Sequence, residues 1–346
     1  MRNILLCVLL AALIWTAGSS NAEASGLCCQ LSSGVQESLA GVAAPGNDEV
    51  SLQFNYSFTK MDRYKEGGVA RSLAEAKTYT KLDGAAYTSV PISMDMMKYT
   101  LTAGYGFNSR FKAFVSLPFV RNTMDMTSSQ GAMLGWMDMT MEPTSGAGDA
   151  TVMGLYRLYR NRDIRPTDAV TLGFGLKAPT GSSTERSSSG SLIHAHMQPG
   201  TGSWDPLLTI MYTKVVDQFL LQADATYQYT TRNREGYEFG DSTAVGFSGK
   251  YAVMKEFGIN AGLTFLQVGR ASDKDGKYYN PATNNSLMDD PANTGGNSLW
   301  FSPGVQVFPK KNLALDAKVQ LPVWERVNGI QLVSSYRVLA GISYNF

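Results

Sequence analysis

The sequence is poor in cysteine and histidine and is close to electrical neutrality. It contains 3 cysteines and 2 histidines in 346 residues, and 30 basic against 29 acidic side chains leave a net charge of +1. Nucleic-acid binding is not predicted, because it calls for a basic patch. No Gly-rich phosphate loop opens a helix, and His194 and His196 have no nucleophile motif beside them. The sequence therefore predicts no enzymatic activity.

Long apolar runs are missing after the first residues. The N-terminus has Arg2, an apolar stretch at residues 4–15 and an Ala-Glu-Ala cleavage site at residues 22–24. These features predict a signal peptide at residues 1–24, because the stretch is shorter than the ~20 residues of a membrane-spanning helix. An uncleaved anchor helix is the alternative. The mean hydropathy of −0.14 also argues against a helical membrane domain.

Two of the cysteines follow this segment. Cys7 leaves with the signal peptide, whereas Cys28 and Cys29 are adjacent in a small, polar stretch at residues 25–47 that we interpret as a periplasmic lead-in. Neighbouring cysteines do not bridge each other readily. A free pair, a crosslink to a partner and the absence of any role are all open.

Alternation of apolar and polar side chains is the main pattern that is present. Between residues 92 and 122, Tyr99 and Leu101 alternate with Lys98 and Thr100, and the pattern continues after a short polar break. Successive strand side chains point to opposite faces, so the pattern predicts two antiparallel strands with one apolar face. The length of each strand fits the ~9–11 residues that a tilted β-strand needs to cross a bilayer. In lipid such strands must close into a barrel, since an open edge cannot be hydrated.

The same pattern recurs along the chain. It predicts about twelve strands, at residues 49–61, 92–107, 111–122, 149–160, 169–178, 205–216, 219–231, 243–253, 257–268, 299–308, 313–322 and 335–346. Connections alternate between long and short, as in outer-membrane barrels with long extracellular loops and short periplasmic turns. We predict an all-β, transmembrane, up-and-down antiparallel β-barrel over residues 48–346 in a Gram-negative outer membrane. A soluble β-sandwich or lipocalin-like barrel is the alternative.

Three short motifs, in this order, resemble a known family. They are Gly-Ala-Gly-Asp at residues 146–149, Lys-Ala-Pro-Thr-Gly at residues 177–181 and Gln-Pro-Gly-Thr-Gly-Ser at residues 198–203. They resemble the outer-membrane transporters of the "meta-pathway of phenol degradation", which are distantly similar to fatty-acid and aromatic-hydrocarbon channels. The resemblance implies a monomer in the lipid bilayer that passes small, often hydrophobic solutes. The terminal Phe346 looks like the residue that barrel-assembly machinery reads.

Methionines and both histidines gather where strands meet the predicted extracellular loops. Spacing of two places extended side chains on one face, and thioethers and imidazoles suit copper. The candidate ligands are Met94, Met96, Met124, Met126, Met137, Met139, Met141, His194 and His196. The hypothesis is a mouth that binds copper or another soft metal. The alternatives are an apolar lining that grips a hydrophobic solute, because methionine is an adaptable filler, and no role.

Charged side chains on the predicted lumen face are mostly basic. They are Lys98, Lys112, Arg157, Lys177, Lys250, Lys318 and Arg337, against Asp149, Asp205, Asp224 and Asp316. An open pore with this lining is expected to favour anions, whereas charges that pair across a narrow barrel fill it instead. A structural barrel around a periplasmic partner such as a cytochrome is a further alternative, although the chain has no Cys-x-x-Cys-His haem motif of its own.

Overall fold

The computed structural model describes residues 49–80, 84–131, 133–163, 166–280, 282 and 285–346. The predicted signal peptide at residues 1–24, the lead-in at residues 25–47 and all three cysteines lie outside the described residues.

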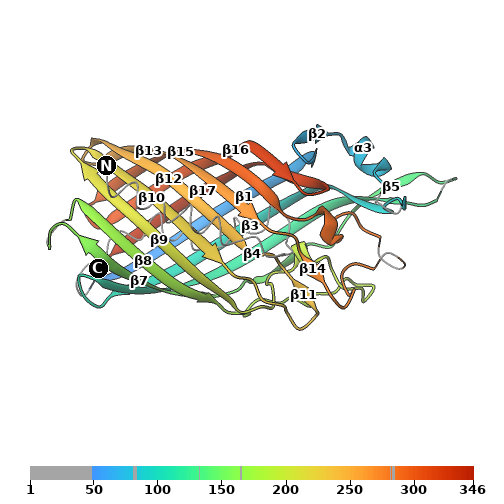
Figure 1. Ribbon diagram of the computed structural model, residues 1–346, viewed down its shortest axis with the longest axis horizontal. Helices are drawn as coiled ribbons and strands as arrows, with labels where there is room; N and C mark the ends of the chain where they lie inside the picture. Colours follow the sequence, from blue (N-terminus) through green and yellow to red (C-terminus); the bar gives the residue numbers. More distant parts are fainter. Residues whose placement is uncertain (1–48, 81–83, 132, 164–165, 281, 283–284) are drawn as a thin grey trace.

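Within the described residues, twelve long strands form a closed barrel in which sequence neighbours pair antiparallel (Figure 1). The barrel strands are β1 (Val50–Glu66), β3 (Ser89–Gly106), β4 (Phe111–Ser129), β7 (Thr151–Arg160), β8 (Asp168–Lys177), β9 (Asp205–Val216), β10 (Phe219–Gln228), β12 (Ser242–Met254), β13 (Phe257–Val268), β15 (Gly296–Lys310), β16 (Leu313–Val327) and β17 (Ile330–Asn345). Pairing of Leu52 in β1 with Tyr344 in β17 belongs to the ladder that closes the ring. The predicted fold class is confirmed.

The alternation along each strand separates an outer apolar surface from a polar inner wall. In β3, Leu101 is 48% exposed and Thr100 only 1%, and in β4 Leu117 is 53% exposed and Ser116 2%. Thr102 and Ser116 share a hydrogen bond of 2.8 Å between their hydroxyl groups on the inner face. A hydrocarbon environment accepts this apolar outer surface, and the strands pair their backbone groups around a closed ring.

The two ends of the barrel differ. Short turns and the C-terminus lie at one end (Figure 1). One of the two-residue turns there joins β9 to β10 through residues 217–218, and its Asp217 has a φ of 52°. Aspartate tolerates this left-handed conformation better than most residues do. The predicted short turns are therefore confirmed.

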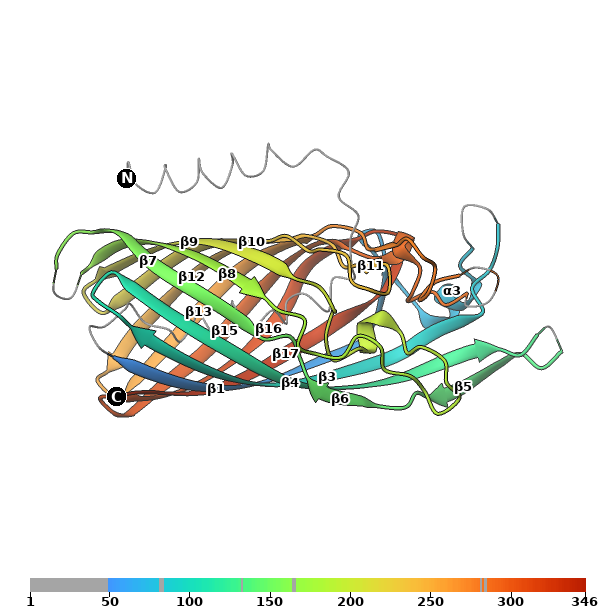
Figure 2. The same cartoon turned by 90° about the horizontal axis from the view of Figure 1, so that it is seen from below.

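The opposite end carries the long loops and their additional elements, and α3 and β5 project there (Figures 1 and 2). These elements are β2 (Val69–Arg71), α3 (Leu73–Thr78), β5 (Trp136–Thr140), β6 (Thr144–Ala147), η2 (Ala195–Met197), β11 (Tyr237–Glu238), β14 (Ser272–Asp273) and η3 (Pro291–Asn293). The short helix α3 is stabilised by a capping box between Ser72 and Glu75. None of the helices in the described residues has the length and apolar character that a membrane crossing requires.

Several predicted strand ends are wrong at this end. β1 continues to Glu66 rather than residue 61, and β4 to Ser129 rather than residue 122. The extensions pair with β2 and β5, so hydrogen bonds continue the strands where membrane-type alternation has stopped. The predicted strands at residues 313–322 and 335–346 are also too short at this end, because β16 and β17 are separated only by Asn328 and Gly329. Gly329 has a φ of 56°, which glycine adopts without strain.

Candidate functional site

The loop between β8 and β9, residues 178–204, folds into the barrel and provides the candidate site. Its short helix η2 is buried, and the Met197 carbonyl accepts hydrogen bonds from the inner wall. Asn122 Nδ2 in β4 donates to that carbonyl at 3.1 Å, and the Thr144 hydroxyl in β6 also donates to it. The tip of this β8–β9 loop is therefore attached to the lumen face of β4 and its neighbour.

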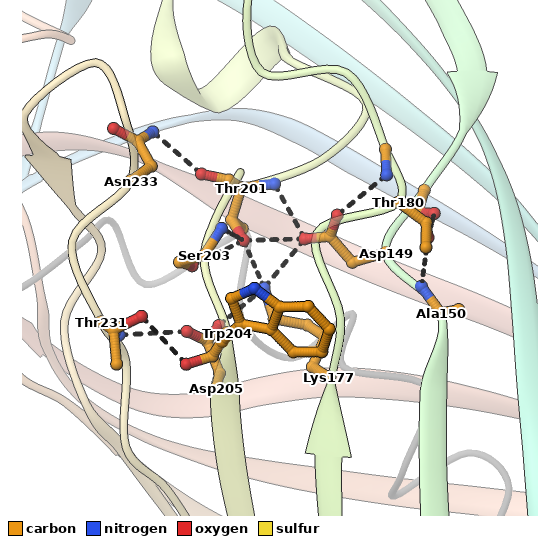
Figure 3. Close-up of polar contacts among 12 residues, drawn as sticks. Asp149, Ala150, Lys177, Thr180, Thr201, Ser203, Trp204, Asp205, Thr231 and Asn233 are labelled. Carbon is orange, nitrogen blue, oxygen red and sulfur yellow. Dashed lines mark hydrogen bonds and ion pairs between the residues drawn. The ribbon is translucent and has the colours of Figure 1, made fainter.

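The base of the loop is held by a buried charged group that we call the loop-base site, comprising Asp149, Lys177, Thr201 and Asp205 (Figure 3). Lys177 Nζ lies 2.9 Å from Asp149 Oδ2 and 2.6 Å from Asp205 Oδ2. The Thr201 backbone N–H donates to Asp149 Oδ2 at 2.8 Å, and the Gly181 N–H donates to Asp149 Oδ1 at 3.1 Å. One carboxylate thus connects the start and the end of the loop.

Two glycines allow the loop ends to approach each other and Asp149. A Cβ added to Gly200 would lie 2.6 Å from both Asp149 Oδ1 and the Gly181 Cα, and one added to Gly181 would lie 2.7 Å from the Gly200 Cα. Distances this short exclude a side chain unless the backbone moves. The Gly200 N–H also donates to the Ser182 carbonyl at 2.8 Å, which fixes this close approach.

The three sequence motifs therefore meet at one place. The first supplies Asp149, the second supplies Lys177 and Gly181, and the third supplies Gly200 and Thr201. The Thr180 hydroxyl adds a bridge, because it donates to the Gly148 carbonyl at 2.9 Å and accepts from the Ala150 N–H at 2.8 Å (Figure 3). Segments that are separate in sequence thus share one physical task, which is to hold the β8–β9 loop against the wall.

The tip of the loop packs into an apolar group that we call the methionine cluster. It comprises Met61, Met94, Met96, Met124, Met126, Met141, Met197 and Met288, together with Ile193 and Leu332. Met61, Met94 and Met124 are 1%, 1% and 2% exposed. They come from β1, β3 and β4, and the loop adds Met197, so wall and loop share one core.

The predicted metal ligands divide between this cluster and other places. Met94, Met96, Met124, Met126 and Met141 belong to the cluster. Met137 and Met139 lie outside it on β5, where they are 51% and 37% exposed. Met137 and Met139 are spaced by two in a strand that extends beyond the barrel wall. The spacing alone does not reveal that these residues lie outside the cluster.

Three members of the cluster were not among the predicted metal ligands. Met61 ends the predicted first strand on the inward parity, and this was the usable signal for it. Met197 follows the His-Ala-His segment directly, whereas Met288 stands in a long loop with no periodic pattern. The position of Met288 depends on packing across the barrel mouth.

The two histidines have separate environments. The His194 Nδ1 lies 2.5 Å from Asp289 Oδ2, which joins the β8–β9 loop to the β13–β15 loop. Burial alone lowers the pKa of His194, but the Asp289 carboxylate outweighs it and raises the pKa above its usual value. Burial lowers the pKa of His196 to about 4, and its ring lies 5.9 Å from the Phe239 ring. The described residues hold no group of three or more His, Cys, Asp and Glu side chains suited to a metal ion.

The described part of the barrel interior contains a small cavity and a larger one. The small cavity, of about 120 Å³, lies beside the loop, and its apolar lining residues include Met96, Pro118, Val120 and Phe239. Its polar lining residues include Lys98, Asn122, Thr151, Gln198, Gln228 and Thr230. Members of the loop-base site and His196 also line it. A second cavity of about 480 Å³ lies toward the short turns. The loop therefore lines the small cavity, whereas the residues around the larger cavity come from the barrel strands and the short turns.

The predicted lumenal charges lie on the inner wall at different depths of burial. Lys98, Lys112, Arg157, Lys177 and Arg337 are buried, whereas Asp224, Lys250, Asp316 and Lys318 are intermediate. Arg157 donates to the Ser109 carbonyl at 2.9 Å. Arg337 donates to the Thr59 hydroxyl at 2.9 Å and lies 5.8 Å from the Trp300 ring. Many of these cations are thus engaged by the wall itself.

Residues 98–332 match the model of a family described as "Putative MetA-pathway of phenol degradation", which is more than half of the chain. The chain belongs to this family. The predicted resemblance is confirmed, and the motifs that carried it form the loop-base site. No curated protein sequence matches the chain.

Solved structures are similar to the chain in fold. One is the crystal structure of an outer membrane channel from Pseudomonas putida F1, with a TM-score of 0.57 and 16% identity over 88% of this chain and 98% of that one. The P. putida toluene transporter TodX has a TM-score of 0.43 and 9% identity, covering 87% of this chain and 90% of that one. The CymD monoaromatic hydrocarbon channel has a TM-score of 0.41 and 11% identity, with coverage of 95% and 94%. Only the fold follows from identities this low.

Proposed function

We propose that this family member is an outer-membrane channel that passes small apolar molecules, and single aromatic rings in particular. Membership of a family described by phenol degradation supports the solute class. The closed barrel with an apolar outer surface supports a location in the outer membrane, where single-chain barrels of even strand number occur.

The observation that carries this proposal is the small cavity beside an apolar, adaptable loop tip. Its volume of about 120 Å³ is comparable to the ~150 Å³ of an apolar protein cavity that holds benzene. Pro118, Val120 and Phe239 can contact a ring, and the polar lining residues, among them Lys98, Thr151 and Gln228, can bind a hydroxyl group. A phenol-like molecule has this combination of a flat apolar body and one polar group.

Passage requires the loop tip to make way, and the methionine cluster suits that requirement. Methionine side chains are unbranched and repack around differently shaped apolar partners. The loop-base site keeps the loop attached while its tip moves. The larger cavity of about 480 Å³ then receives the solute. That volume is too small for a folded protein, which disfavours the alternative of a barrel around a periplasmic partner.

The test is uptake of radiolabelled toluene and of a hydrophilic sugar by cells that express the protein, compared with cells that do not. We expect several-fold faster toluene uptake and unchanged sugar uptake. Val120→Phe fills the cavity and should reduce the gain. Val115→Phe is the matched control, because Val115 lies on the same strand but is 40% exposed on the outer surface.

Two results contradict the proposal. The first is equal acceleration of toluene and sugar, which indicates an open aqueous pore. The second is toluene uptake that Val120→Phe leaves unchanged. Fractionation of the same cells tests the location in the outer membrane. Assembly through Phe346 and the monomeric state stay predictions.

A further inference from the structure

We propose that the methionine cluster is a binding site for a soft monovalent cation, Cu(I) or Ag(I). This property goes beyond passage of apolar solutes and does not depend on it. The proposed ligands are the thioethers of Met61, Met94 and Met124 on the barrel wall and of Met197 on the β8–β9 loop.

The composition of the cluster is the first observation. Eight of its ten side chains are methionine, although an apolar core needs no sulfur. The cluster beside it at the same end of the barrel contains no methionine, and consists of Tyr64, Ala76, Tyr87, Val90, Leu287 and Ile330 with Leu73, Tyr79, Trp136 and Leu332 packed against them. Leu287 and Met288 are consecutive, yet the leucine packs into the second cluster and the methionine into the first.

Strand register provides the second observation. Met61 in β1 is paired with Met94 in β3, and Met94 is paired with Met124 in β4. All three side chains are buried on the inner face. Cβ atoms of directly paired residues lie about 4.5–5.5 Å apart, so the three methionines form one row of adjacent residues across three strands. The loop places Met197 against this row.

The chemistry of the ligands selects the ion. Thioether sulfur is a soft, neutral donor that favours Cu(I) over hard ions such as Mg²⁺ and Ca²⁺. Four neutral ligands leave the ionic charge uncompensated, and a charge of +1 costs less to bury than +2. Thioethers need not lose a proton before they bind, in contrast to thiols and imidazolium groups. Binding should therefore persist at mildly acidic pH, where a histidine site weakens.

The ion also has a route to the site. Met96 belongs to the methionine cluster and at the same time lines the cavity of about 120 Å³. A sulfur atom at the cavity surface allows transfer from water to the buried row. The flexible methionine side chain allows the ligands to turn their sulfur atoms toward an ion without movement of the strands.

The experiment is titration of the purified protein in detergent with Ag(I), and with Cu(I) under reducing conditions against a chromophoric Cu(I) chelator, at pH 7 and pH 5. We expect one ion per chain at both pH values and no comparable binding of Zn²⁺ or Ca²⁺. The triple variant Met61→Leu, Met94→Leu and Met124→Leu should lose more than the roughly 10–100-fold in affinity that loss of a supporting residue causes. Leucine retains apolar volume, so the barrel should fold.

Matched controls separate the cluster from methionine in general. Met137→Leu with Met139→Leu removes two exposed M-x-M thioethers and should leave affinity unchanged. Met197→Leu alone alters only the loop ligand, keeps the wall intact and should still weaken binding, which maintains the test if the triple variant fails to fold. Absence of Cu(I) and Ag(I) binding overturns the proposal. So does binding that the cluster variants retain, or binding that is lost at pH 5.

Discussion

The base and the tip of the β8–β9 loop are both attached to the barrel, but polar and apolar contacts contribute to the two attachments in different proportions. At the base, Lys177 lies between Asp149 and Asp205, and backbone N–H groups point at one carboxylate. At the tip, most contacts are between thioethers, Ile193 and Leu332. The polar contacts there are the hydrogen bonds to the Met197 carbonyl and the contact between His194 and Asp289. Charged hydrogen bonds require fixed distances and directions, whereas apolar contacts between flexible side chains do not. The base should therefore be rigid and the tip adaptable.

This difference explains where the family motifs lie. All three motif segments contribute to the base, where a close approach of Gly181 to Gly200 and a buried carboxylate leave few alternatives. None of the methionines of the tip belongs to a motif. Met197 directly precedes the third motif, which begins at residue 198. A shared base can hold a loop whose tip suits different solutes.

The largest expected effect comes from removal of the central carboxylate. Asp149→Ala deletes the acceptor of Lys177, of both Thr201 donors and of the Gly181 N–H. Loss of one partner of a buried ion pair costs about 3–5 kcal/mol. The loop should open more often, so hydrogen exchange at the Gly200 amide, which is bonded to Ser182, should accelerate at least about 100-fold.

A partly exposed ion pair provides the control. Lys60 and Asp95 lie 2.8 Å apart with side chains 27% and 30% exposed, outside the loop. Such pairs contribute about 0–1 kcal/mol, so Asp95→Asn should leave exchange at Gly200 nearly unchanged. If Asp149→Ala also changes exchange by less than tenfold, the base is not the rigid end and the comparison fails.

A smaller effect is expected from one methyl group at the close approach. Gly200→Ala brings Cβ into contact with Asp149 and Gly181 at 2.6 Å, and overpacking of this kind costs about 1–3 kcal/mol. Gly146→Ala is the matched control in another motif, because its nearest neighbour is Pro199 at 3.7 Å. Its effect should stay within about 0.5 kcal/mol. Exchange at the Ala178 amide measures both, and equal effects would contradict a tightly fitted base.

The barrel itself could be predicted from sequence because membrane strands carry a strict period of two. Strands β9 and β13 lie at the predicted residues 205–216 and 257–268 without any shift. The strand ends that extend beyond the wall, such as the end of β4 with β5, do not follow this membrane pattern. In β4 the alternation continues, but the apolar Met124 and Met126 are the buried residues. The pairing of these strand ends depends on contacts between loops, which the local sequence does not encode.

The candidate site was predictable in part for the same reason. Parity places Met94 and Met124 on one inner face, and the structure brings them together. Met288 and Asp289 approach from a loop far away in sequence. The common location of the three motifs likewise depends on the closed ring. The sequence shows the order of these short motifs but not the contacts between them.

The smallest expected effect concerns the tip and its pH dependence. His194 is linked to Asp289, which raises the pKa of His194 despite burial of the ring. A raised pKa means that the link stabilises the closed loop fully below the pKa of the released histidine, near 6.5, and that the contribution is lost as pH rises through the folded pKa. Protection of the Met197 amide, which donates to the His194 carbonyl, should therefore decrease above pH 6.5, by at most about tenfold per pH unit for one proton.

Titration of the neighbouring His196 does not contribute to this measurement. Burial lowers the pKa of His196 to about 4, so its ring stays neutral between pH 6.5 and 8.5. His194→Gln removes the titrating group and should flatten the dependence at Met197, while protection at the Gly200 amide of the base should stay level in both proteins after correction for intrinsic exchange. A parallel loss of protection at the Met197 and Gly200 amides would mean that base and tip open as one unit, because deprotonation of His194 would then increase opening of the whole loop.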